Sequence, residues 1–200
     1  MMTDVQGSMV DRLAQSLTQL RAASLSRALS QGDKLHPDIY LSWDDVQGRV
    51  TGTAASTPGM VLRLSAQVEG MPRWWGLNLV LGAARLAPGS VLGIAADLEG
   101  PEGATLAPFI RSGRGNEALD TPLAEPLAMA GSRRVVTLLH DVDQGQPLAA
   151  TGPDDDAWHT LVLPLPDGRF ELVLHDLRLF VIPPEAGMRA APRTLASYAT

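Results

Sequence analysis

After residue 37 the sequence is a succession of short apolar segments separated by turn signals rich in glycine and proline. Residues 60–68 show the pattern, with Leu62 and Leu64 on one side and Arg63 and Ser65 on the other. This period of two is that of a strand with one face in the core and one in water. About ten such segments at this spacing are typical of a β-sandwich or barrel.

These turns mark where each expected strand ends and the next one begins. Two polar or irregular connections interrupt the series, residues 111–131 and residues 141–156. The expected strands are residues 38–43, 48–53, 60–68, 73–81, 91–98, 105–110, 135–139, 158–163, 169–174 and 177–182.

The N-terminal residues have helical rather than strand periodicity, and we expect one helix over residues 8–29. Gly32 is the expected C-cap. Leu25 and Leu29 do not continue the first apolar stripe, so the helix would contact more than one surface. It either packs into a crevice of the sandwich or forms a contact between subunits. The first apolar stripe consists of Val10, Leu13, Leu17 and Leu20.

These patterns divide the chain into three parts: an N-terminal helical segment (residues 1–36), a β-sandwich (residues 37–183) and a Pro/Ala-rich tail (residues 184–200). A chain of 200 residues with 45% apolar content can bury a core of its own. No apolar run is long enough to predict a membrane span. The first residues lack the features of a secretory signal, which predicts cytoplasmic synthesis.

Composition excludes several kinds of site. The sequence has no cysteine, so it has no disulfide, thiolate metal ligand or cysteine nucleophile. A net charge of −6 argues against a nucleic-acid partner, because nucleic-acid binding needs clustered cations. The four histidines are scattered and no nucleophile elbow is present, so neither a zinc site nor a hydrolase triad is indicated. No cofactor is expected.

The adjacent tryptophans are the most suggestive feature for function. In the strand expected over residues 73–81, Trp75 falls on the leucine-rich side, and Trp74 shares the other side with Gly76 and Asn78. An indole beside an amide on an open sheet face can stack on a sugar ring while the amide hydrogen-bonds to it. Alternatively the N-terminal helix covers that face and buries Trp74.

The tryptophan-containing strand, the loop from Arg111 to Asn116 and the closing segments 158–166 and 170–180 together resemble β-jelly-roll carbohydrate-binding modules. The resemblance covers residues 38–182 and implies a mostly β fold: a jelly-roll-type antiparallel β-sandwich, here with an N-terminal α-helix. It also implies a non-catalytic glycan-binding function, with ligand-binding residues Trp74, Asn78, Arg111 and Asn116.

A jelly-roll protein that is made inside the cell, as the lack of a secretory signal predicts, is similar to the spike and decoration proteins of tailed phages and gene transfer particles. That resemblance implies an alternative function, a structural protein that forms a homo-oligomer through the helix or attaches to a particle and is released with it. An enzyme ranks third.

An acidic run gives the one candidate metal site. Asp154 and Asp156 offer carboxylate oxygens of the kind that Ca²⁺ prefers, and jelly-roll modules often hold a structural calcium ion. The spacing is not that of an EF-hand loop. A solvated turn beginning Gly-Pro-Asp explains the same residues.

Overall fold

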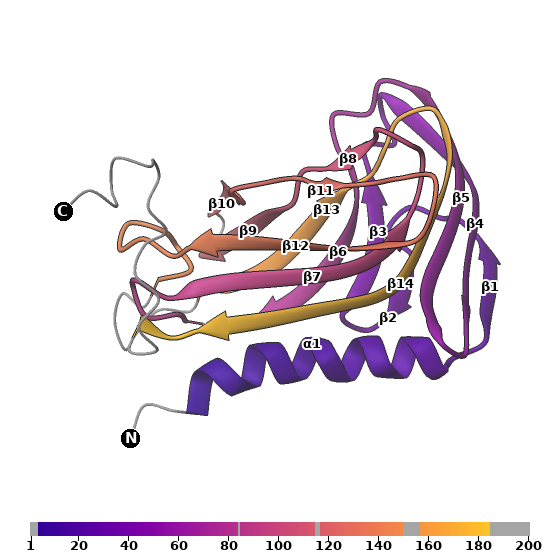
Figure 1. The fold of residues 1–200 in the computed structure, drawn as a ribbon. Coiled ribbons are helices and arrows are strands. Elements are labelled where there is room, and N and C mark those ends of the chain that lie inside the picture. Colours follow the sequence, from indigo (N-terminus) through magenta and orange to yellow (C-terminus); the bar gives the residue numbers. More distant parts are fainter. Residues whose placement is uncertain (1–3, 84, 115–116, 150–156, 185–200) are drawn as a thin grey trace, which may run out of the picture.

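Two six-stranded antiparallel sheets face each other, and one helix runs along the side of the sandwich (Figure 1). This is the architecture of a computed structural model, which describes residues 4–83, 85–114, 117–149 and 157–184. The first sheet, sheet A, has the order β1 (Leu25–Ala28), β4 (Gly48–Thr57), β5 (Met60–Gly70), β14 (Arg169–Ile182), β7 (Val91–Glu99), β12 (Arg134–Asp141).

The second sheet, sheet B, carries the candidate site. Most connections pass from one sheet to the other, as in the predicted jelly-roll-type sandwich. A two-stranded sheet of β8 (Thr105–Leu106) and β11 (Leu127–Ala128) lies apart. The order of sheet B is β10 (Glu117–Pro122), β9 (Phe109–Arg114), β13 (Trp158–Pro164), β6 (Trp75–Gly82), β3 (Ile39–Trp43), β2 (Lys34–His36).

The core lies between the sheets and is built from the alternation seen in the sequence. The predicted inward row of β6 is confirmed, because its residues are at most 5% exposed. Trp75 packs edge-on against Trp43 of the paired strand β3, with ring centroids 5.6 Å apart. Such edge-to-face aromatic pairs add stability beyond the apolar area that they bury. The inward row of β6 consists of Trp75, Leu77, Leu79 and Leu81.

The helix α1 (Asp4–Ala22) is shorter than expected. The predicted continuation to residue 29 is wrong, because residues 25–28 form β1 and pair with β4. The hydroxyl of Ser56 in β4 donates to the carbonyl of Leu20 and so ties the end of the helix to this strand. Gly32 is therefore not a helix cap; it has a φ of 70° in the turn between β1 and β2. The segment 1–36 accordingly contains two strands as well as the helix.

The helix takes the place of a strand beside part of β14. Only residues 169–174 of β14 pair with β5, whereas residues 173–182 pair with β7 on the other side. Figure 1 shows α1 running alongside this second part of β14. Met9, rather than the predicted Val10, completes the buried stripe. The buried apolar residues among the described side chains of the helix are Met9, Leu13, Leu17 and Leu20.

Two further segments differ from what the sequence predicted. Residues 169–174 and 177–182 are one continuous strand with a bulge near residue 175, not two strands. The stretch 111–131, expected to be irregular, continues β9 and forms the hairpin partner β10. No helix in the described part of the chain has the length and apolar character needed to cross a membrane.

Candidate functional site

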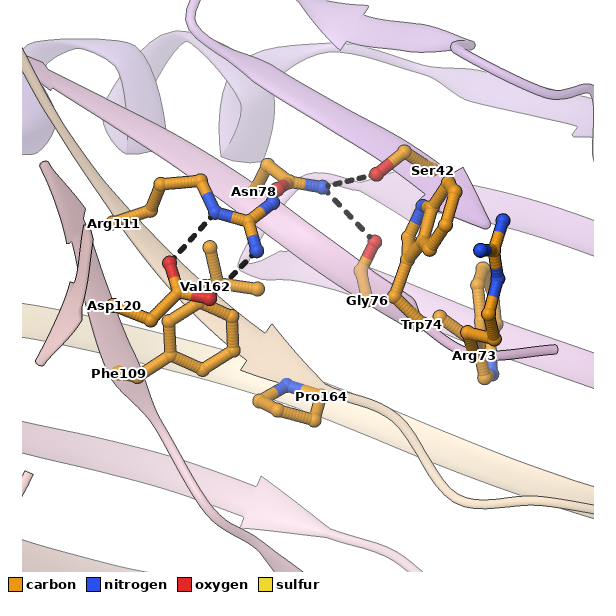
Figure 2. Close-up of a pocket in the computed structure, with 11 residues that line it drawn as sticks. Ser42, Arg73, Trp74, Gly76, Asn78, Phe109, Arg111, Asp120, Val162 and Pro164 are labelled. Atoms are coloured by element: carbon orange, nitrogen blue, oxygen red, sulfur yellow. Dashed lines mark hydrogen bonds and ion pairs between the residues drawn. The ribbon is translucent and has the colours of Figure 1, made fainter. Parts of the chain in front are cut away.

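The outer face of sheet B contains a hollow of about 240 Å³ that runs across its strands (Figure 2). Small-molecule pockets that enclose their ligand are typically about 300–1,000 Å³. A ligand here would therefore lie on the sheet face rather than inside the protein. The lining residues are Ser42, Arg73, Trp74, Trp75, Gly76, Asn78, Phe109, Arg111, Asp120, Val162 and Pro164.

Strand register explains why residues far apart in the sequence meet here. Gly76 of β6 lies between Ser42 of β3 and Pro164 of β13. A side chain would not fit easily at Gly76, since an added Cβ would lie 3.0 Å from the backbone oxygen of Leu163 in β13. The glycine therefore leaves the hollow open at this position. The next row brings together Asn78, Val162 and Phe109. Arg111 and Asp120 face each other across the β9–β10 hairpin.

Trp74 forms the aromatic wall of the hollow and is open to solvent. Its side chain is 46% exposed, which answers the question left open by the sequence. The helix lies near the opposite end of β6, where Arg12 approaches Gly82, and does not cover Trp74. An exposed indole on a sheet face offers an apolar surface for stacking.

Arg73 and Asp44 hold this wall in place. The Arg73 guanidinium carbon lies 5.2 Å from the centre of the Trp74 ring, within cation–π range. Its Nε donates to the carboxylate of the buried Asp44 at 2.6 Å. That hydrogen bond lowers the pKa of the Asp44 carboxyl below its usual value, although burial acts in the opposite direction.

Asn78 forms the polar floor. Its amide nitrogen donates to the hydroxyl of Ser42 at 2.9 Å and to the carbonyl of Gly76 at 3.2 Å. The side chain is 5% exposed. These bonds fix the orientation of the amide, so the floor beneath the hollow is preorganised.

The wall opposite Trp74 is an ion pair. Arg111 donates from Nε and Nη2 to the two carboxylate oxygens of Asp120, each at 2.7 Å. The arginine also lies over the ring of Phe109, 5.4 Å from its centre. The hydrogen bond to Asp120 raises the pKa of Arg111 above its usual value. Figure 2 shows this pair and Trp74 on opposite sides of Asn78 and Gly76.

Three of the four predicted ligand residues line this hollow: Trp74, Asn78 and Arg111. The fourth, Asn116, lies outside the described residues, and so do the candidate calcium ligands Asp154 and Asp156. In the part of the chain that the structure describes, no group of three or more His, Asp or Glu residues is placed to hold a metal ion.

Sequence reasoning missed Arg73, Phe109 and Asp120. Phe109 could have been found by continuing the alternation of the expected strand as far as Arg111, since both residues then fall on the same face. Asp120 gave no such signal, because its position depends on the register of a hairpin within a stretch expected to be irregular.

No protein-family model matches the sequence, and no curated protein matches it significantly. Solved structures do match the fold. The N-terminal cellulose-binding domain of Cellulomonas fimi β-1,4-glucanase C is 13% identical over 81% of this chain and 97% of that domain, with a TM-score of 0.47. The CBM22-1 xylan-binding domain from Paenibacillus barcinonensis is 14% identical over 81% and 99%, with a TM-score of 0.42.

A third similar structure is the family 11 carbohydrate-binding module from Clostridium thermocellum in complex with a β-1,3-1,4-mixed-linked tetrasaccharide. It is 11% identical over 80% of this chain and 97% of that module, with a TM-score of 0.44. All three are distant likenesses of strand arrangement. The ligand of this chain is therefore inferred from its own residues.

Proposed function

We propose that this protein is a non-catalytic glycan-binding module whose ligand lies in the hollow on the outer face of sheet B. The observation that carries the proposal is the exposed indole of Trp74 beside a fixed polar floor. Sugar rings have an apolar face and a rim of hydroxyls, so they need both kinds of surface. The described lining supplies the indole, an amide and an ion pair in one shallow site.

The carboxylates support binding rather than glycoside hydrolysis. Hydrolysis generally uses two carboxyl groups that flank the scissile bond. Among the described residues that line the hollow, Asp120 is the one carboxylate, and both its oxygens accept from Arg111. Asp44 does not line the hollow, and its carboxylate accepts from Arg73.

The assembly alternative has no separate observation in its favour. A helix with two apolar directions would favour it, but Leu25 belongs to β1 and the helix ends at Ala22. The apolar stripe of the helix is buried against this chain's own sheets. Attachment to a phage-like particle likewise stays a prediction from the sequence.

Trp74→Ala is the direct test of the proposed function. We expect it to weaken binding to soluble polysaccharides by about tenfold or more, the size typical of losing a tryptophan anchor. The measurement is affinity electrophoresis over a panel that includes soluble cellulose derivatives, xylan and mixed-linkage β-glucan, followed by calorimetry on the best ligand.

Trp158→Ala is the matched control. Trp158 is 42% exposed and lies on the same face of sheet B, over Gly113, but it does not line the hollow. Its removal should leave binding of short oligosaccharides unchanged. Equal losses in both variants, or no binding by the wild-type protein to any glycan, would count against the proposal. Release of reducing ends from the panel would contradict its non-catalytic part.

A further inference from the structure

The charged groups of the hollow are balanced in pairs. Arg111 uses two of its donors for both oxygens of Asp120, in a bidentate bond with two distances of 2.7 Å. Arg73 is bonded to the carboxylate of Asp44 at 2.6 Å. Each positive charge among the described lining residues thus has a negative charge within hydrogen-bond distance, and this part of the site presents little net charge to a ligand.

The Arg111–Asp120 pair contributes little to the fold. Its two side chains are 40% and 43% exposed, and exposed ion pairs typically contribute about 0–1 kcal/mol to stability. It lies on the β9–β10 hairpin, where every described side chain of β10 except the half-buried Thr121 is exposed. The pair therefore affects which ligands can bind beside it more than it affects the stability of the fold.

We infer that Asp120 makes this site selective for uncharged glycans, by occupying the face of Arg111 that would otherwise receive a sugar carboxylate. The inference rests on the proposed function and names its substrate class. The fork of a guanidinium fits a carboxylate through two parallel N–H bonds, and Asp120 already has that position.

The two kinds of sugar meet this pair differently. A uronic acid would have to displace Asp120 or approach its negative charge, and unfavourable pairings of this kind are how binding sites reject wrong ligands. A neutral sugar hydroxyl can donate to a carboxylate oxygen and accept from a remaining guanidinium N–H, because a hydroxyl does both. The intact pair therefore suits a neutral ligand.

The test uses matched ligands: each neutral glucose polymer of the panel, the cellulose derivative and the mixed-linkage β-glucan, and the same polymer with its C6 hydroxymethyl groups oxidised to carboxylate. We expect the wild-type protein to bind the neutral form better. Asp120→Asn keeps the shape of the side chain and frees Arg111. We expect it to gain about tenfold in affinity for the oxidised polymer, the size of one charge-assisted hydrogen bond. The gain should shrink with added salt.

Two variants separate this mechanism from a change in overall charge. Glu117→Gln removes a negative charge from the same strand but outside the lining of the hollow, and should give no comparable gain. Adding Arg111→Gln to Asp120→Asn should abolish the gain. Unchanged melting temperatures would show that the fold is intact in each variant.

The outcomes distinguish the two proposals. If the wild-type protein binds neutral and oxidised polymers equally, or if Asp120→Asn gains nothing, the selectivity inference is overturned while the glycan-binding function stands. If the wild-type protein binds neither polymer, both proposals fail. Preference for the neutral form that Asp120→Asn reverses or reduces supports the inference.

Discussion

A buried amide links packing and binding at the level of single residues. Asn78 lies under the hollow with its nitrogen bonded to Ser42, Gly76 and the backbone carbonyl of Tyr40. A polar side chain at 5% exposure is stable there because its donors are used. The same bonds hold strands β3 and β6 in a fixed relation beneath the proposed ligand.

Replacing this amide should cost both stability and binding. Asn78→Ala removes both N–H donors of the amide and leaves their acceptors partly buried, so we expect a loss of about 1–3 kcal/mol in the free energy of unfolding. Ser42→Ala removes one acceptor and leaves the two backbone bonds, so its loss should be smaller. Urea denaturation of the two variants checks the order, and a larger loss in Ser42→Ala would contradict it.

At the level of elements, α1 replaces a strand. Where β5 stops pairing with β14, the helix continues the wall of the sandwich and buries its apolar stripe in the common core. Its polar side is tied to the sheets by ion pairs, from Arg12 to Asp38 and from Arg21 to Asp176. By covering this open side, the helix prevents the unpaired strand edges from pairing with strands of other chains.

The helix should therefore be part of the cooperative fold. Leu13 is 1% exposed, and Leu13→Ala should lower the free energy of unfolding by about 2–5 kcal/mol, as truncation of a core leucine does. Gln15 is exposed on the same helix, so Gln15→Ala should change stability by less than about 0.5 kcal/mol. Similar small effects in both variants, measured by chemical denaturation, would show that the helix does not belong to the folding unit.

At the scale of the whole molecule, arginine–aspartate pairs join separate parts of the chain. Arg12 of the helix binds Asp38 in the turn between β2 and β3, Arg73 binds Asp44 at the hollow, and a further pair joins Arg133 to Asp97 of β7. In each pair the hydrogen bond from arginine is the main cause that lowers the pKa of the aspartate carboxyl. The folded protein therefore holds these groups ionised more strongly than the unfolded chain does.

Acid should weaken the fold through these groups. The unfolded chain takes up protons first, near the ordinary aspartate pKa of about 3.9, so this contribution to stability is present above that pH and is lost as pH falls through the lower folded pKa values. We expect the melting temperature to fall between about pH 5 and pH 2. Asp97→Asn should flatten part of that fall, and a melting temperature independent of pH in this range would rule out the linkage.

Much of the sandwich could be predicted from local pattern. Alternation in residues 60–68 and 73–81 gave the strand positions and the inward faces, because side chains of a strand point alternately to its two sides. The same alternation placed Trp74 and Asn78 on one outer face. It could not say whether another element covered that face, so the exposure of Trp74 stayed open.

The missed features depend on partners distant in sequence. Residues 25–28 suit either a helix or a strand, and their pairing with β4 decides for the strand. Asp120 reaches Arg111 only through the register of the β9–β10 hairpin, in a stretch without a clear period.

Local periodicity and composition were enough to predict a cysteine-free β-sandwich with one N-terminal helix, since the periods of two and 3.6 are properties of the local backbone. Tertiary structure alone decided where the helix lies and which face of sheet B stays open. It also brought Trp74, Asn78 and the Arg111–Asp120 pair to one hollow. The physical reason is that these outcomes depend on strand register and on which surfaces compete to be buried, and neither is recorded in the local pattern.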